Sequence, residues 1–425
     1  MQVKKIIENY RSKTYNLLRW SEKFTKTDMV YLTKGGFWLT LGQIFSSISG
    51  LLLAVAFAHL IPQEIYGNYK YILSLVGILS ALSLSGIGVS ITQNTARGFE
   101  GSLEQGFWEN LRWGILVILA SLGGFIYYFL NENYTIAYSL LIAGTTYPIL
   151  QSSSFYGSFL GGKREFKAST IIGIFRSIIP AFLIFLTIIF TQNLIIIITV
   201  YSLSHAITAL FFYFYTIKKF KPNNKIDEKN INFGKHLSLM GSLGTVADNL
   251  ESILIFHFFG GAQLAVYTFA TALPKQFNFL KKAIQTMALP KLSQKSIPEL
   301  KKIIPTKIAI LFFSLIPVVG AYILSAPYIY KIFFPQYLDS VIYSQILSLY
   351  IFLFPSLFYT QALIAHARKK ELYIINTVVP IISIILLITL LPIYGIWGAV
   401  ATSIISKIIH FILIAFIFHK TLFFK

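Results

Sequence analysis

The sequence contains no cysteine and few acidic residues, with 16 Asp and Glu against 36 Lys and Arg. Because there is no cysteine, disulfide bonds, thiolate metal sites and thiol catalysis are excluded. The GxSxG, P-loop and HExxH patterns are also missing. The chain therefore lacks the local signatures of α/β-hydrolases, P-loop nucleotide-binding enzymes and zinc proteases.

Charged residues make up only 12% of the 425-residue chain, whereas apolar residues make up 55%. Apolar runs repeatedly exceed the about 20 residues that a membrane helix needs. A β-barrel is the only other architecture that spans a membrane, and it would show strands of about ten alternating residues rather than a run such as 178–191. The sequence therefore predicts an all-α polytopic membrane protein.

About twelve membrane spans are predicted from windows of about 19 residues bounded by Lys and Arg. They lie at 35–61, 66–92, 111–130, 135–160, 168–190, 194–217, 234–258, 264–290, 303–325, 340–364, 371–391 and 395–419. Basic residues gather on one side, and only Lys70 and Lys331 are assigned to the other. By the positive-inside rule, both termini are predicted to be cytoplasmic. This bias also explains most of the net charge of +20, so no nucleic-acid partner is predicted.

An internal repeat divides the chain into two halves. His59 and Tyr69 follow the first span with the same separation as His257 and Tyr267 after the seventh, an offset of about 200 residues. Both halves start on the same side, so the repeats run parallel and would enclose a central cavity, as alternating access requires. The predicted parts are a cytoplasmic amphipathic segment at 1–34, a six-helix lobe at 35–217, a cytoplasmic linker at 218–232 and a second six-helix lobe at 233–425.

Two segments are predicted to lie as amphipathic helices on the inner leaflet. The first is 1–34, where apolar residues share a helical face among Lys and Arg. The second is 97–110, where Phe99, Leu103 and Phe107 recur at four-residue spacing. Both are interpreted as anchors rather than binding sites.

Only two acidic residues, Asp248 and Glu251, fall well inside the predicted spans, and their i, i+3 spacing puts them on one helical face. A charge at the centre of a membrane helix costs roughly 2.5–3.5 kcal/mol, so such residues usually face a cavity. We predict an ion-coupling site for H⁺ or Na⁺, with no other cofactor and no other metal. The alternative is a static pair between one carboxylate and a lysine of the cavity.

Several cations also lie within the spans, and a mostly cationic cavity predicts an anionic cargo. Arg176 lies about 8 residues, or roughly 12 Å, into the fifth span, and Lys407 is equally deep in the twelfth. In the eighth span, Lys275, Asn278 and Lys282 share one face, and Lys281 flanks it. These six residues are the predicted substrate contacts. Alternatively, Lys281 and Lys282 reach the interface, and Arg176 and Lys407 pair with a carboxylate or with carbonyls.

Three stretches carry a family resemblance: AHLIPQEIYGNYKYILSL at 58–75, GSFLGGKREF at 157–166 and DNLESILIFHFFGGAQLAVYTFA at 248–270. They resemble hallmark segments of the polysaccharide-export or O-antigen flippases of the Wzx type. This family is related to the lipid II flippases and to the multidrug and toxin extrusion transporters. Many relatives have fourteen spans, and the twelve predicted here suit the Wzx type.

The resemblance implies a two-lobed bundle with the multidrug-and-toxin-extrusion fold. Such a protein moves an undecaprenyl-diphosphate-linked oligosaccharide across the bacterial cytoplasmic membrane for O-antigen, capsule or exopolysaccharide synthesis. Membrane lipids, and polymerase and chain-length proteins of the same pathway, would be its partners. The resemblance also favours Asp248 as the coupling acid, because lipid II flippases can carry a cation-binding acid in this span.

Two other functions compete with this hypothesis. A multidrug or cation antiporter of the same fold should line its lobes with carboxylates, yet the first half shows no acid within its spans. A membrane glycosyltransferase or polymerase would act on the outer face. The outer connections are short and carry only Glu64, Glu132 and Asp339 as acids, so few residues there could act as catalytic acids or bases.

Overall fold

The computed structural model describes residues 29–293, 295–366 and 368–420, and its regular secondary structure is helical throughout these ranges. Most of the amphipathic segment predicted at 1–34 lies outside the described residues. The first half contains α2 Met29–Leu60, α3 Gln63–Leu79, η1 Ser80–Leu82, α4 Ile87–Ala96, α5 Ser102–Leu130, α6 Tyr134–Ser153, α7 Tyr156–Gly162, α8 Phe166–Phe190 and α9 Leu194–Phe220. The second half contains α10 Glu228–Gln276, α11 Asn278–Ser293, α12 Ile297–Phe333, η2 Pro335–Tyr337, α13 Ser340–Ser348, η3 Leu349–Ser356, α14 Leu357–Ala365, α15 Lys369–Tyr394 and α16 Ile396–Lys420.

The described residues confirm the predicted class of a polytopic helical membrane protein. Nine of their helices are long and apolar enough to cross a membrane, and a tenth span is formed if α3 and η1 are joined to α4 across a bend of 59°. The predicted fourth span corresponds to α6 and α7, and the seventh and eighth share the long stretch Ile231–Lys282. Helices dominate because a bilayer leaves backbone N–H and C=O groups no partner outside the chain.

A single glycine separates the seventh and eighth predicted spans. Gly260 adopts φ 79° and ψ −178° inside α10, a conformation that other residues rarely tolerate. The helix therefore breaks at this point. The same helix ends at Gln276, and α11 begins at Asn278, so Phe277 separates the two helices.

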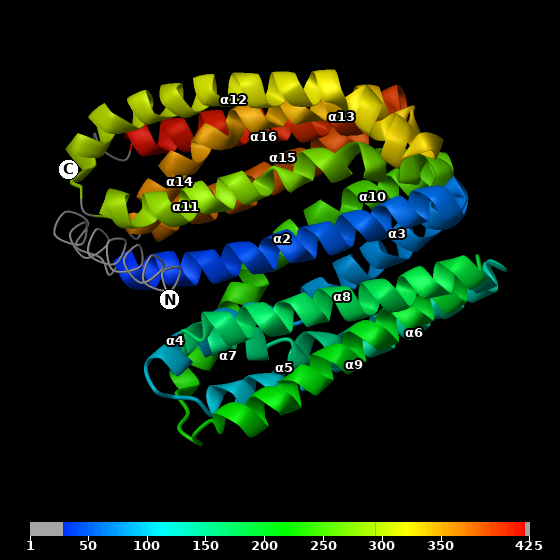
Figure 1. The fold of residues 1–425 in the computed structure, drawn as a ribbon, viewed down its shortest axis with the longest axis horizontal. Coiled ribbons are helices and arrows are strands. Elements are labelled where there is room, and N and C mark those ends of the chain that lie inside the picture. Colours follow the sequence, from blue (N-terminus) through cyan, green and yellow to red (C-terminus); the bar gives the residue numbers. More distant parts are fainter. Residues whose placement is uncertain (1–28, 294, 367, 421–425) are drawn as a thin grey trace, which may run out of the picture.

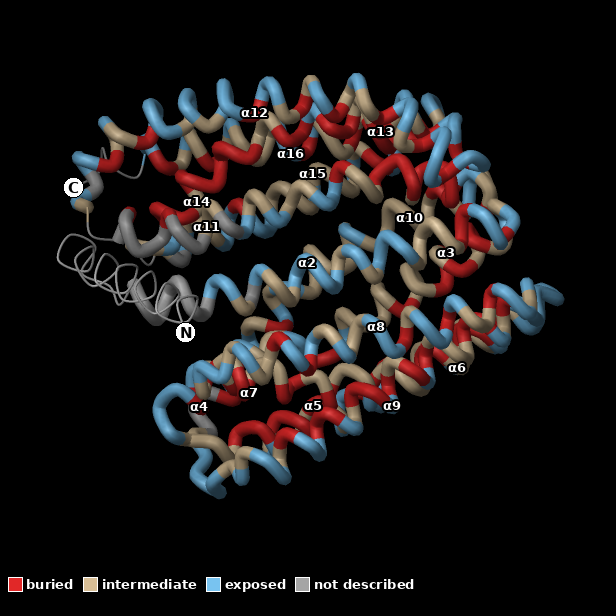
Figure 2. Tube along the Cα trace, in the orientation of Figure 1, coloured by how far each residue is buried: buried red, intermediate tan, exposed pale blue. Residues whose placement is uncertain are grey.

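The helices form two groups, which we name the first lobe (α2–α9) and the second lobe (α10–α16). Figure 1 shows the second lobe above the first, with the two converging at the end where α2 turns into α3 and diverging toward the end where α2 begins and α16 ends. Figure 2 shows buried residues between the helices and exposed ones along the outer side of α12. This pattern fits helices whose outer faces meet lipid.

The two lobes touch most closely where α3 packs against α10. Gly67 and Gly261 allow the backbones to meet, because a Cβ on Gly67 would lie closer to the Gly261 carbonyl oxygen than real Cβ atoms come to any neighbour. Next to them, the ring of Tyr66 lies 4.9 Å from that of Phe269, centroid to centroid, and the ring of Phe269 lies 3.9 Å from that of Tyr337. This contact closes the gap between the lobes at one end.

The start of α10 is attached to the first lobe rather than to the second. The amide of Gly101 donates to the Lys225 carbonyl oxygen at 3.0 Å. Lys235 Nζ forms an ion pair with Glu109 of α5 at 2.8 Å, and Ser238 Oγ accepts a hydrogen bond from the Gly86 amide at 2.9 Å. The residues from 225 to 238 therefore lie against α4 and α5, although the sequence assigns those after 232 to the second lobe.

The predicted surface helix at 97–110 is wrong, and the reason is packing. Residues from Ser102 onward continue into the span as the single helix α5. Leu103 is only 1% exposed and Phe107 8%, and both belong to a core cluster with Ile91 and Phe159. Their four-residue spacing marks a face buried against α4 and α7, not a face lying on lipid.

Candidate functional site: a cavity lined by lysines

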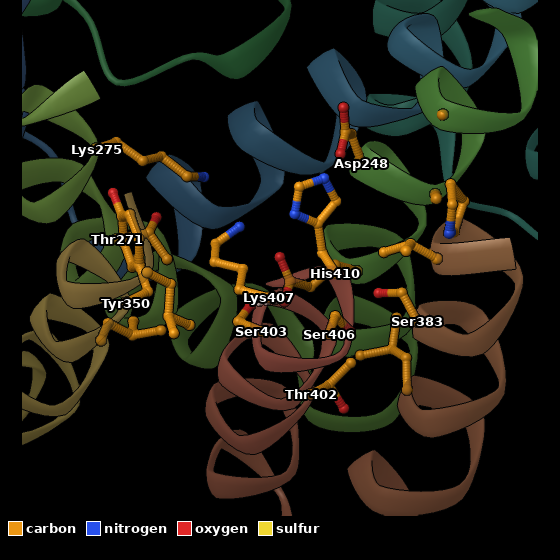
Figure 3. A pocket seen from close by; sticks show the side chains of 18 of the residues that line it. Asp248, Thr271, Lys275, Tyr350, Ser383, Thr402, Ser403, Ser406, Lys407 and His410 are labelled. Carbon is orange, nitrogen blue, oxygen red and sulfur yellow. Dashed lines mark hydrogen bonds between the residues drawn. The ribbon is translucent and has the colours of Figure 1, made fainter. Parts of the chain in front are cut away.

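A cavity of about 610 Å³ lies within the second lobe, between α10, α11, η3, α15 and α16. We name it the second-lobe cavity. Six of the eight residues predicted as site residues line it: Asp248, Glu251, Lys275, Asn278, Lys281 and Lys407. Figure 3 shows the side chains of Lys275, Lys407, Asp248 and His410 directed into the same space.

Two of the three lysines of this cavity lie over aromatic rings. Lys407 Nζ lies 5.2 Å from the ring centroid of Tyr350, and Lys281 Nζ lies 5.9 Å from that of Phe354. Among the described residues, no carboxylate comes within ion-pair distance of Lys275, Lys281 or Lys407. Their charges are therefore available to a negatively charged ligand.

The two acids of α10 differ in their surroundings. Glu251 Oε1 accepts hydrogen bonds from Tyr267 Oη at 2.5 Å and from Ser403 Oγ at 2.9 Å. Asp248 is exposed to the cavity, and Lys407 and Lys275 are near enough to attract it electrostatically. The Asp248 carboxylate is therefore accessible to ions in the cavity, whereas hydrogen bonds hold Glu251 between α10 and α16.

A second, smaller pocket of about 380 Å³ joins the lobes, and we name it the interlobe pocket. Gln43 and Ser47 of α2 face Lys282 and Gln285 of α11 across it. Lys275, Asn278 and Lys281 line both this pocket and the second-lobe cavity. The two spaces therefore share a basic wall.

The cations predicted together are not all brought together. Lys282 lines the interlobe pocket, while Lys281 also reaches the second-lobe cavity. Arg176 lies in α8 of the first lobe, where its Nη2 donates to Ser154 Oγ at 2.6 Å. The predicted substrate contacts therefore divide between two lobes.

One further cation lies between the lobes. The structure places Lys70 inside α3, not in an outer connection. Its Nζ lies 5.3 Å from the ring centroid of Tyr66 and 5.6 Å from that of Tyr69. Lys70 therefore lies beside the aromatic contact between the lobes and lines neither pocket.

The described residues offer no cluster of three or more His, Asp or Glu side chains that could hold a metal ion. The arrangement instead suits an anion of some size, because lysines from several helices converge on a cavity with many hydroxyl groups. These hydroxyls come from Tyr267, Thr271, Ser356, Ser383, Thr402, Ser403 and Ser406.

Comparison with known proteins bears on the family and the fold. The family model described as polysaccharide biosynthesis protein matches residues 32–294, which is more than half of the chain. The chain belongs to this family. The match confirms the resemblance to polysaccharide-export proteins that the three sequence stretches carry. Among curated proteins, no sequence matches this member of the family.

Solved structures show the fold of this polysaccharide biosynthesis protein. It is similar to an inward-facing multidrug resistance MATE family transporter, with a TM-score of 0.69, 16% identity, and coverage of 91% of this chain and 98% of that one. It is also similar to the lipid II flippase MurJ in an inward closed conformation, with a TM-score of 0.66, 18% identity, and coverage of 89% of this chain and 86% of that one. A MOP superfamily transporter from Pyrococcus furiosus matches with a TM-score of 0.65, 16% identity, and coverage of 92% of this chain and 95% of that one. The predicted fold is confirmed.

Some residues of the cavity in this polysaccharide biosynthesis protein were not predicted as site residues from its sequence. Tyr350 and His410 line the cavity, and Ser403 and Tyr267 hold Glu251. A helical pattern around Lys407 could have found Ser403 and His410, because they lie four residues before it and three after it. No local pattern indicates Tyr350.

The contrast between the two acids gives a testable prediction. Glu251→Leu is expected to lower stability by about 1–3 kcal/mol, because Tyr267 and Ser403 lose their shared acceptor. Asp248→Leu, a matched change, should leave stability within about 0.5 kcal/mol because no described partner loses a hydrogen bond. Thermal unfolding of both purified variants measures the difference. Equal destabilisation by the two changes would contradict the assigned roles.

Proposed function

We propose that this protein is a flippase that moves an undecaprenyl-diphosphate-linked oligosaccharide across the bacterial cytoplasmic membrane for surface polysaccharide synthesis. The family and the fold support a flippase or transporter of this kind. The lysine-lined cavity is the single observation that carries the choice of substrate. O-antigen, capsule or exopolysaccharide units all share the diphosphate linkage.

The charges in the second-lobe cavity favour an anionic cargo. Three lysines line it against two carboxylates, one of which already accepts two hydrogen bonds from Tyr267 and Ser403. Ammonium groups and phosphate oxygens form charge-assisted hydrogen bonds, which are about twice as strong as neutral ones. Hydroxyl groups on the same walls can replace the water that the sugars lose on entering the membrane. A cationic drug would instead meet lysine repulsion.

The interlobe pocket is the natural place for the diphosphate. It lies between α2 and α11, so a headgroup held there touches both lobes at once. Lys275, Asn278 and Lys281 extend from it into the second-lobe cavity, where the sugars can follow. Relative movement of the lobes would then carry the headgroup across while the isoprenoid chain stays in lipid.

The remaining parts of the proposal concern coupling and orientation. Asp248 lines the same cavity as the lysines and has no hydrogen bond to another described side chain, so it is the residue proposed to bind H⁺ or Na⁺ during the cycle. Both termini are proposed to be cytoplasmic, since the basic residues of the sequence gather on that side.

Deleting the gene should cause lipid-linked repeat units to accumulate on the cytoplasmic leaflet. The complete chain should remove them, whereas Lys275→Gln should restore less than about a tenth of the export rate, because a charge-assisted bond to the diphosphate is lost. Leaflet-specific labelling of the lipid-linked sugars measures the accumulation.

Lys331→Gln provides the matched control, because Lys331 is an exposed lysine near the end of α12 and lines neither pocket. It should complement fully. Absence of accumulation in the deletion strain would overturn the flippase proposal. Full complementation by Lys275→Gln would overturn the role given to the basic wall that the two pockets share.

A further inference from the structure

An apolar groove follows the contact between α2 and α8 of the first lobe, and we name it the α2–α8 groove. Its volume is about 720 Å³. The two helices lie side by side (Figure 1), where Thr170 Oγ1 donates to the Trp38 carbonyl oxygen at 2.8 Å and Ser49 Oγ donates to that of Ser177 at 3.2 Å. The described residues that line the groove include neither a lysine nor a carboxylate. Its chemistry therefore differs from that of both basic pockets.

Small side chains produce the hollow between these helices. Ser49 and Ala56 of α2 and Ala181 of α8 line the groove and are half-buried, whereas Leu52 and Phe182 are 64% and 57% exposed. Larger side chains at the three small positions would fill the space. Because the Ser49 hydroxyl is donated within the helix pair, the length of the groove offers mainly hydrocarbon surface to a ligand. The groove therefore suits an apolar chain.

The groove is longer than one leaflet of a membrane. On α2, its lining residues run from Phe45 to Leu60, which is about 22 Å at 1.5 Å per residue. One leaflet contributes about 15 Å, which is half of the hydrocarbon core. In the proposed orientation Leu60 lies at the outer end of α2, so the groove continues inward past the midplane. An acyl chain of an outer-leaflet phospholipid ends near the midplane, whereas an undecaprenyl chain is long enough to fill the whole groove.

The outer end of the groove is polar, and its inner end lies near the interlobe pocket. His59 lines the outer end, where Gln192 Nε2 donates to the Leu60 carbonyl oxygen at 3.3 Å. At the inner end, Gln43 lines the interlobe pocket two residues before Phe45 lines the groove. The helical period places Gln43 and Phe45 on opposite faces of α2. A lipid whose headgroup leaves the interlobe pocket for the outer side can therefore lay its chain along α2.

We propose that the α2–α8 groove binds the isoprenoid chain of the transported lipid once its diphosphate has reached the outer side, at the end where His59 lies. The inference rests on the proposed function and orientation, and it adds a site for the lipid chain after translocation. In a bilayer no hydrophobic effect favours the groove over lipid, so binding comes from van der Waals contacts summed along the chain. A chain longer than one leaflet makes more of these contacts than an acyl chain.

Photocrosslinking of the full chain in phosphatidylcholine vesicles tests the groove. A photoreactive phenylalanine replaces Leu52 in one variant and Leu119 of α5 in the control, because Leu119 is similarly exposed at 57% and lines none of the pockets described above. A labelled undecaprenyl-diphosphate-linked disaccharide should be captured about tenfold more often at Leu52, since packing along the groove favours its chain. Unlabelled undecaprenyl lipid in excess should compete, whereas the same headgroup on a short farnesyl chain should not.

A filled groove provides the second measurement. Ala56→Phe should lower the flipping rate of the undecaprenyl lipid about tenfold, whereas Gly123→Phe should leave it unchanged, because Gly123 is exposed on α5 with nothing within 4 Å of an added Cβ. Capture at Leu52 needs no change in the small residues, so it decides the question even where Ala56→Phe does not fold.

The outcomes separate this inference from the proposed function. Equal capture at Leu52 and Leu119 by a chain that flips the lipid would overturn the groove and leave the flippase intact. Equal competition by the farnesyl lipid would overturn it as well, because a short chain would then suffice. A wild-type chain that does not flip the undecaprenyl lipid would overturn the proposed function and, with it, the inference.

Discussion

Gly67→Ala is expected to abolish transport almost completely. The new methyl group would overlap the carbonyl group of Gly261, and this neighbour is backbone that cannot rotate away. The two lobes could no longer meet where α3 crosses α10, so the closed end would be forced open. Overpacking costs of about 1–3 kcal/mol are typical where side chains can adjust, and a backbone clash should exceed them.

A single cysteine reports the opening directly, because the natural chain contains none. Thr271 lines the second-lobe cavity and is 8% exposed. Thr271→Cys should be protected from a membrane-impermeant maleimide added outside. Adding Gly67→Ala should expose it. Gly123→Ala is the matched control, since its new methyl group meets nothing within 4 Å. Normal transport and unchanged protection in the Gly67→Ala variant would show that this contact does not close the lobes.

Lys407→Gln is expected to reduce flipping by about 10- to 100-fold. The ammonium group lies over Tyr350 in the second-lobe cavity, with no carboxylate at ion-pair distance. Its loss removes a charge-assisted hydrogen bond worth about 1.5–3 kcal/mol, which corresponds to that range of rates if the interaction acts in the rate-limiting step. The glutamine keeps much of the side-chain volume, so the packing on Tyr350 should survive.

Lys307→Gln serves as the control for this change. Lys307 is an exposed lysine of α12 that lines neither pocket, so its substitution should change the flipping rate by less than twofold. Flipping of one undecaprenyl-diphosphate-linked disaccharide in proteoliposomes compares the variants. A similar loss in both would indicate a general effect of basic residues on the membrane rather than a role of the cavity.

Within one helix, the sequence predicted which residues share a face. Asp248 and Glu251 were placed on one face by their spacing, and both line the second-lobe cavity. Asn249, which the helical period places on a different face, lies against Gly77 of α3. Such predictions succeed because the helical period alone decides which residues share a face.

Where a helix breaks, the sequence did not predict which residues share a face. Lys275 and Lys282 were placed on one face of a continuous helix, yet the chain breaks near Phe277 between α10 and α11. Lys281, expected beside that face, lines both pockets, while Lys282 lines the interlobe pocket. The period cannot be extended across a break that changes the rotation of the chain.

The sequence by itself determined the membrane class, the approximate spans and the excess of cations over acids, because a bilayer demands long apolar helices and tolerates few charges. Only the tertiary structure decided which charges meet. It separated Arg176 from the lysines of the second lobe and placed Lys70 over the rings of Tyr66 and Tyr69. It also placed Glu251 in a hydrogen bond with Tyr267, whereas Asp248 faces the cavity. Contacts between helices far apart in the chain follow from packing, which no local pattern records.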